Sequence, residues 1–79
     1  MVEPRLAIRL REVRLAAGLT QADLAERAGV SRKTVNTVEN GVFTPSVLVA
    51  LSLARALDVS VEALFSLEAV SPGWTRNRF

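Results

Sequence analysis

Apolar residues along this chain recur at helical spacing, in short segments separated by glycine, proline or serine. Between Arg5 and Ala17 they stand at i, i+4, i+7 and i+11, starting from Leu6, and Gly18 follows as a candidate C-cap. This spacing predicts one amphipathic helix over the whole segment. We find no convincing alternation of period two within the predicted core, so no strand is expected there.

Two short helices are predicted next. Thr20 is suited to cap a helix over 21–28, and Asp23 stands where its carboxylate can complete a capping box. A glycine then turns the chain, and Ser31 is suited to cap a helix over about 32–40. Two short helices joined by so tight a turn form a helix-turn-helix arrangement.

The last two predicted helices begin at clear capping signals. Thr44, followed by Pro45 at the first helical position, predicts a helix that runs to Leu57. Ser60 is suited to cap a brief helix over 61–65. The sequence therefore predicts an all-α fold, with five helices packed in a small bundle.

Residues 1–65 are expected to form one domain, with a tail over 66–79 that the pattern leaves open. One interpretation is a short strand, Ser66–Val70, that pairs with its copy across a dimer axis. A second is a linker to a further domain. A third is a basic arm that touches phosphates while Trp74 and Phe79 pack on the body.

Composition excludes several function classes. The 79 residues contain neither cysteine nor histidine, and no glycine-rich phosphate loop. A thiol nucleophile, a disulfide framework and the commonest zinc ligands are therefore missing, so we expect neither an enzyme nor a cofactor nor a metal site. No apolar run approaches the roughly 20 residues that a membrane span needs. We expect a cytoplasmic protein without a membrane partner.

The helix over 32–40 has an unusually polar outer face. Val35 and Val38 fix its inward side, and the outward side carries Arg32, Lys33, Asn36, Thr37 and Asn40. Arginine and lysine suit guanine edges in the major groove of DNA, asparagine suits adenine, and threonine offers a hydroxyl or a methyl contact. Polarity alone also fits an ordinary solvated surface. Glu39 is the acidic exception on the core side, and we predict a partly buried ion pair with Arg14 of the first helix.

Two stretches carry a family resemblance. "LTQADLAERAGVSRKTVNTVENG" and "TPSVLVALSLARALDVSVEALF" resemble the Xre family, the Cro and phage-repressor type of helix-turn-helix transcriptional regulator, over roughly residues 6–65. The resemblance implies a five-helix lambda-repressor-like fold, usually a homodimer, that binds operator DNA sequence-specifically and controls transcription. We expect a repressor on an inverted repeat, with its two recognition helices in successive major grooves.

The resemblance also implies roles for individual residues. Base reading, or contact with adjoining phosphates, falls to Arg32, Lys33, Asn36 and Thr37. Contacts to the DNA backbone fall to Gln21, Ser31 and Asn40, and Arg14 with Glu39 match the structural ion pair of the family. Val42 departs from the pattern, because a cation often stands there, so Thr44 or Ser46 is expected to add backbone contacts.

Some apolar side chains are expected on the surface. They are Ile8, Leu15, Leu48, Leu64 and Leu67, and they are candidates for a dimer or partner surface. Scattered exposed aliphatic residues are also normal on proteins. The alternative function that this surface suggests is an antitoxin-like or adaptor module, which uses the same fold mainly to bind a protein.

Overall fold

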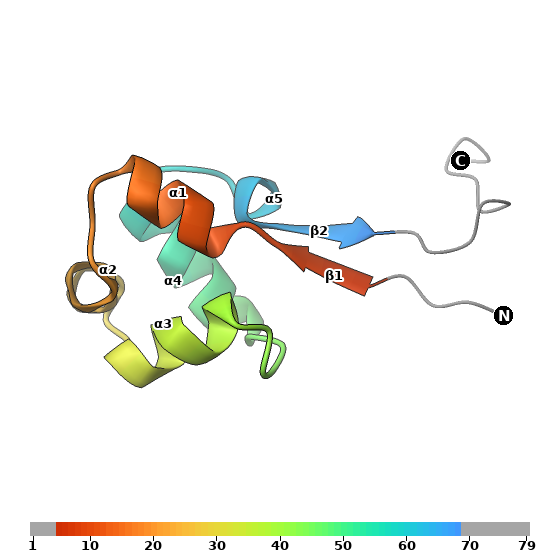
Figure 1. Cartoon of the computed structure of the whole chain (residues 1–79), viewed down its shortest axis with the longest axis horizontal. Coiled ribbons are helices and arrows are strands. Elements are labelled where there is room, and N and C mark those ends of the chain that lie inside the picture. The colour runs from red at the N-terminus through yellow and green to blue at the C-terminus, as the bar shows by residue number, and fades with distance from the viewer. Residues whose placement is uncertain (1–4, 69–79) are drawn as a thin grey trace, which may run out of the picture.

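The computed structural model describes residues 5–68 as five helices and a two-stranded antiparallel sheet. In chain order the elements are β1 (Arg5–Ile8), α1 (Leu10–Ala16), α2 (Gln21–Ala28), α3 (Arg32–Glu39), α4 (Val47–Leu57), α5 (Val61–Leu64) and β2 (Phe65–Glu68). The helices gather at one end, and the sheet projects from them as a ribbon (Figure 1). The predicted five-helix fold class is confirmed. None of these helices is long and apolar enough to cross a bilayer.

Hydroxyl side chains cap the N-termini of α2, α3 and α5 at the residues that the sequence predicts, and α4 is the exception. The Thr20 hydroxyl accepts from the Asp23 N–H, and the Asp23 carboxylate accepts from the Thr20 N–H, each at 3.0 Å. These hydrogen bonds lower the pKa of Asp23, the larger share coming from the Thr20 backbone. Ser31 and Ser60 cap α3 and α5 in the same manner. The starts of the three helices are therefore locally determined.

Residues 29–31 form the tight turn between α2 and α3. Gly29 ends α2 with φ of 73°, in the left-handed region that residues with a Cβ adopt only at a cost. In Figure 1, α2 is seen nearly end-on while α3 lies across the view, so the two axes are steeply inclined. The predicted helix-turn-helix arrangement is confirmed.

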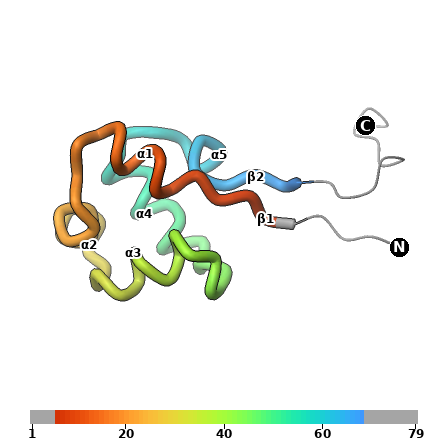
Figure 2. The backbone as a smooth tube through the Cα atoms, in the orientation of Figure 1, coloured from red at the N-terminus to blue at the C-terminus, as the bar shows by residue number. Residues whose placement is uncertain are grey.

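The first predicted helix begins too early. Residues 5–8 form β1, which pairs with β2 so that Leu6 faces Leu67 and Ile8 faces Phe65. Figure 2 shows the first and last described segments running side by side. The Arg9 N–H donates to the Leu64 carbonyl at 2.8 Å, which continues this pairing to the start of α1. A backbone bonded to a neighbouring strand cannot also form helical hydrogen bonds, so α1 begins only at Leu10.

One of the three interpretations of the tail, a short strand, agrees with the structure over the residues that are described. β2 covers Phe65–Glu68, so it begins one residue earlier than Ser66, and it pairs with β1 of the same chain. The last two residues of the Ser66–Val70 interpretation lie outside the described segment. The ribbon ties the two ends of the described segment together. The linker and basic-arm interpretations, with Trp74 and Phe79, fall on residues outside the described segment.

The start of α4 lies two residues later than predicted. Ser46 rather than Thr44 is the cap, because its Oγ accepts from the Val49 N–H at 3.1 Å. Pro45 therefore precedes the helix. Proline is compatible both with the position before the cap and with the first helical position, where its missing N–H has no intrahelical acceptor to lose, so it does not select between the two starts. Val47, in the first turn, is 76% exposed and does not face the core.

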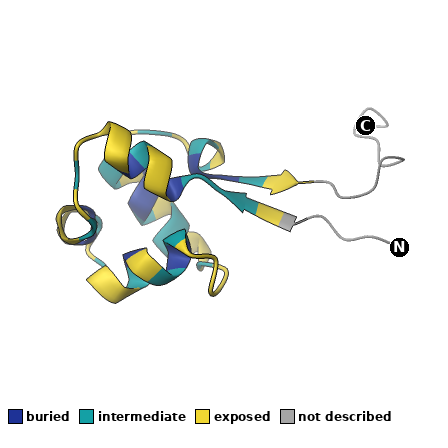
Figure 3. Cartoon of the chain, viewed as in Figure 1, coloured by how far each residue is buried: buried dark blue, intermediate teal, exposed yellow. Residues whose placement is uncertain are grey.

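One hydrophobic core lies between the helices, with the buried side chains facing inward (Figure 3). The apolar residues without exposed surface are Leu10, Leu24, Val35, Val38, Leu53 and Leu64. The prediction that Leu64 lies on the surface is therefore wrong. Ile8 lies in β1 and is half-buried against the core, so the expectation that it is a surface residue is also wrong. Leu15, Leu48 and Leu67 are exposed.

Candidate nucleic-acid interface

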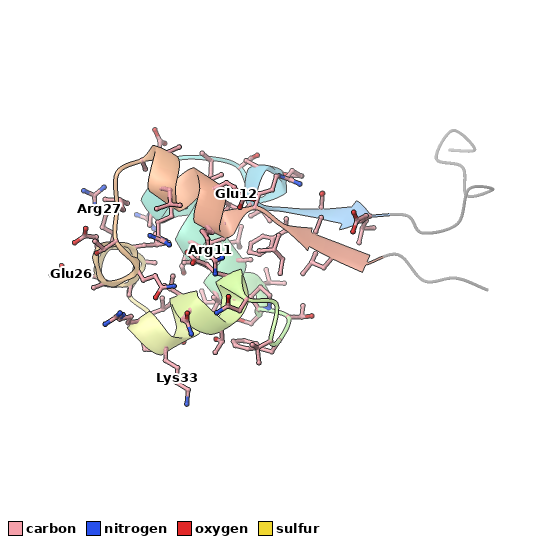
Figure 4. All side chains as sticks on the ribbon, in the orientation of Figure 1. Arg11, Glu12, Glu26, Arg27 and Lys33 are labelled. Carbon is pink, nitrogen blue, oxygen red and sulfur yellow. The ribbon has the colours of Figure 1, made fainter. Side chains whose placement is uncertain are left out.

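Helix α3 presents its polar side chains to solvent, as the sequence predicts. Val35 and Val38 are fully buried, whereas Arg32, Lys33 and Asn36 are exposed. Figure 4 shows Lys33 extending from α3 away from the other helices. Because the helix has only eight residues, its two valines must hold it against the core while the opposite face stays free.

Other predicted DNA-contacting residues are already engaged within the protein. The Thr37 hydroxyl donates to the carbonyls of Lys33 and Thr34, both at 3.0 Å, and the residue is half-buried. The Ser31 hydroxyl caps α3 and also bonds the Thr34 hydroxyl at 2.9 Å. Thr44 is exposed in the loop before α4. Because the hydroxyl hydrogen of Thr37 is used by these carbonyls, its methyl group is the part more available to another molecule.

The predicted ion pair joins α1 to α3. Arg14 donates from Nε to Glu39 Oε2 at 2.5 Å and from Nη2 to Oε1 at 3.2 Å. Its Nη1 donates to the Leu19 carbonyl at 2.9 Å, in the loop before α2. The Arg14 side chain is 9% exposed and that of Glu39 is 0% exposed. The pair therefore connects α1, the loop before α2 and α3 through charge-assisted hydrogen bonds.

The carboxyl group of Glu39 is held in its charged form. Burial by itself raises its pKa, but hydrogen bonds from Arg14 and Gln21, the charge of Arg14 and a hydrogen bond from Arg11 outweigh that effect. The pKa of Glu39 therefore lies below its ordinary value. The hydrogen bond to Glu39 in turn raises the pKa of Arg14.

Arg11 is a member of this site that our sequence analysis missed. It donates from Nε to Glu39 Oε1 at 3.4 Å and from Nη2 to Asn40 Oδ1 at 2.7 Å. Figure 4 shows it between α1 and α3. Arg11 precedes Arg14 by three residues and so lies on the same face of α1. That spacing is the signal that could have identified it.

Amide side chains extend the network to the exposed face. Gln21 Nε2 donates to Glu39 Oε1 at 3.0 Å and to Asn36 Oδ1 at 3.2 Å. Asn40 Nδ2 donates to the same Asn36 oxygen at 3.1 Å. Both hydrogens of the Gln21 amide are therefore used inside the protein. A phosphate contact from this side chain would break one of these bonds, whereas the backbone N–H groups in the first turn of α2 have no intrahelical acceptors.

The exposed side of this network is hollowed and positively charged. Gln21, Arg32, Lys33 and Asn36 line a shallow hollow between the start of α2 and the start of α3. Within residues 5–68, Arg32 and Lys33 form no ion pair. The two positive charges thus remain available to a polyanion, while the acidic residue of the helix is neutralised behind them. The same segment holds no cluster of side chains suited to a metal ion.

Comparisons with known proteins agree with this geometry. A family model described as helix-turn-helix matches residues 10–64. An uncharacterized HTH-type transcriptional regulator of Methanothermobacter thermautotrophicus is 45% identical over 60 residues, which cover 75% of this chain and 87% of that protein. The restriction-modification controller protein C.AhdI from Aeromonas hydrophila superposes with a TM-score of 0.66 at 44% identity, over 68% of this chain and 82% of its own.

A further structural neighbour contains nucleic acid. SinR, a regulator of Bacillus subtilis described as the master regulator for biofilm formation, has been solved in complex with DNA. That structure superposes with a TM-score of 0.65 at 31% identity, over 68% of this chain and 87% of its own. The chain therefore belongs to the helix-turn-helix transcriptional regulators, and within them to the Xre family of Cro and repressor-like DNA-binding proteins, with a lambda-repressor-like fold.

Proposed function

We propose that this protein controls transcription by binding an operator sequence, with α3 as the recognition helix in the major groove. The observation that carries the proposal is the exposed, cationic face of α3, formed by Arg32, Lys33 and Asn36 over a fully buried pair of valines. Arginine, lysine and asparagine supply the hydrogen bonds that distinguish base edges in that groove. The structural similarity to SinR, which has been solved in complex with DNA, supports DNA binding by analogy.

Contacts to the DNA backbone would come from groups that flank α3. At the starts of α2 and α3 the N–H groups of residues 21–22 and 32–33 have no intrahelical acceptor, whereas those of Asp23 and Thr34 bond to the capping hydroxyls. Helix ends of this kind favour phosphates. The predicted neutral contacts are Ser31 at the start of α3, Asn40 at its end and Thr44 in the loop before α4, and Arg32 and Lys33 add charge. These contacts would fix the orientation of the domain on the duplex, while base-edge contacts would carry the sequence preference.

A homodimer on an inverted repeat is the assembly that we propose. On α4, Val47, Leu48 and Leu51 are 76%, 75% and 53% exposed. Their spacings of three and four residues place Leu51 beside both of the others on one helix face. Pairing this face with its copy would bury it and give two recognition helices, about 34 Å apart in successive major grooves. Bound to a promoter, such a dimer would repress by occluding polymerase.

The same apolar face favours one alternative, a module that mainly binds another protein. The two functions differ in their response to salt. Operator binding weakens steeply, with a log-log slope near −0.9 for each phosphate neutralised, because counterions are released. An apolar protein contact would change little over the same range. The exposed charges of α3 have no evident use in a pure adaptor, which is why we favour the operator-binding function.

Selection from a random DNA pool at moderate salt tests the proposal. The selected sequence is then titrated against a scrambled duplex of the same composition. We expect an inverted repeat with half-sites about one helical turn apart, bound at least roughly a thousandfold more tightly than the scrambled duplex. Equal binding to both duplexes would reject sequence-specific regulation and favour the protein-binding module.

A further inference from the structure

The direction of every hydrogen bond between Asn36 and its neighbours is set by charged groups at the two ends of the network. A carboxylate only accepts, so Gln21 must turn Nε2 toward Glu39. A guanidinium only donates, so Asn40 must turn Oδ1 toward Arg11. Neither amide can flip without placing like groups together. The orientation of each amide is therefore set by its charged hydrogen-bond partner, even though the oxygen and nitrogen of an amide group are nearly identical in shape.

In these orientations both amides donate to the same acceptor atom, Asn36 Oδ1. Gln21 Nε2 uses its second hydrogen to donate to this oxygen, and Asn40 Nδ2 donates to it as well, at 3.2 and 3.1 Å. A carbonyl oxygen has two lone pairs, so the acceptor capacity of Asn36 is filled. Among residues 5–68, no acceptor binds its Nδ2 group. The part of Asn36 left for another molecule is a donor.

An asparagine that reads adenine needs both halves of its amide, because it accepts from N6 and donates to N7. Asn36 cannot do this without giving up a bond inside the protein. Guanine instead offers two neighbouring acceptors, N7 and O6, on its major-groove edge. Arg32 and Lys33, the two exposed cationic side chains on this face, are also donors only.

We infer that Asn36 reads guanine rather than adenine, and that the network from Arg11 and Glu39 sets this preference. The inference rests on the proposed function, since it specifies which base edge the recognition helix contacts. Asn36 is a specificity residue, and Gln21, through Nε2, is a positioning residue for it. The operator half-site would then be rich in guanine acceptors opposite the start and middle of α3.

The test uses single-base-pair substitutions of the selected operator, measured with the full chain and with Asn36→Ala. The position read by Asn36 is the one whose substitution penalty collapses in the variant. We expect guanine there, and replacement by adenine should weaken binding roughly tenfold. Inosine keeps N7 and O6 and should bind as guanine does, whereas 7-deazaguanine lacks N7 and should bind more weakly.

Gln21→Met provides the test of positioning. Methionine keeps the length of the side chain but frees one lone pair of Asn36 Oδ1, so the preference for guanine over adenine should fall severalfold at that position only. Preferences at positions read by Lys33 should remain unchanged. A general loss on every duplex would show that Gln21 acts on affinity alone and would overturn its positioning role.

Two outcomes would overturn the inference while leaving the proposed function intact. One is an Asn36-dependent position at which adenine is preferred. The other is a specific operator without any position that depends on Asn36. If the pool yields no preferred sequence, the proposed function fails and takes this inference with it. The three results are distinguishable in one set of titrations.

Discussion

Arg14 of α1 donates hydrogen bonds from Nε and Nη2 to both oxygens of Glu39 on α3, and the Glu39 side chain has no exposed surface. The two charges are therefore bound to each other rather than to DNA. Because Arg14 also holds the Leu19 carbonyl, the pair fixes the recognition helix relative to α1 and the loop before α2. The pair would therefore contribute to DNA binding by orienting the recognition helix, not by contacting DNA.

Glu39→Ala should lower the free energy of unfolding by about 3 kcal/mol, because it leaves the buried Arg14 without its charged partner and with only the Leu19 carbonyl as an acceptor. For a domain of this size that corresponds to a fall in Tm of roughly 10 °C or more. Thermal melting followed by circular dichroism measures it. Glu26→Ala is a control, since Glu26 is exposed on α2, and its Tm should change little. Equal melting curves for the two variants would show that the pair does not stabilise the fold.

Stability should depend on pH through the same carboxyl group. The folded-state pKa of Glu39 is lowered from 4.5, so its contribution is fully present above about pH 4.5 and is lost as the pH falls through the lower folded value. We expect the Tm to be nearly constant from pH 7 to pH 5 and then to fall. Glu39→Gln should flatten this fall when each curve is referred to its own value at pH 7. Parallel curves for both proteins would place the acid sensitivity elsewhere.

Leu48→Glu should separate assembly from folding. Leu48 is 75% exposed, so a charge there is tolerated in the monomer but would be buried in the proposed α4 interface. We expect a Tm close to that of the parent at low concentration and a shift from dimer to monomer in light scattering at tens of micromolar. Leu15→Glu makes the same chemical change on α1, where the residue is 60% exposed. The sequence also made Leu15 a candidate for this surface, but an interface formed by α4 leaves it out, so this variant should stay dimeric. A parent protein that is itself monomeric at that concentration would contradict the homodimer.

Those features that depend on neighbouring residues were predictable from the sequence. The caps Thr20, Ser31 and Ser60 lie within three residues of the N–H groups that they accept from, so local chemistry decides them. The inward direction of α3 follows from Val35 and Val38 alone. The ion pair was predictable because Arg14 and Glu39 each lie on the core flank of an amphipathic helix.

Features that depend on distant partners were not predictable from the pattern. Leu6 and Leu10 fit helical spacing, yet β1 forms because residues 65–68 pair with it from the other end of the described segment. Leu64 was expected at the surface, but the same pairing brings α5 against the core and buries it. Thr44 and Ser46 are equally good caps by type, so only the surrounding structure selects Ser46. Both lone pairs of Asn36 Oδ1 are filled only when α1, α2 and α3 are packed together, because Gln21 comes from α2 and Arg11 of α1 orients Asn40.

The central claim is that the exposed side chains of α3 read DNA sequence. The most direct measurement compares Lys33→Ala with Arg27→Ala, which removes the same charge from α2 on a different side of the molecule (Figure 4). Each variant is titrated with the selected operator and with its scrambled duplex. We predict that Lys33→Ala costs about 1–3 kcal/mol on the operator and far less on scrambled DNA, while Arg27→Ala changes the ratio of the two little. An equal loss from Lys33→Ala on both duplexes would contradict the account, because Lys33 would then contribute charge but not recognition.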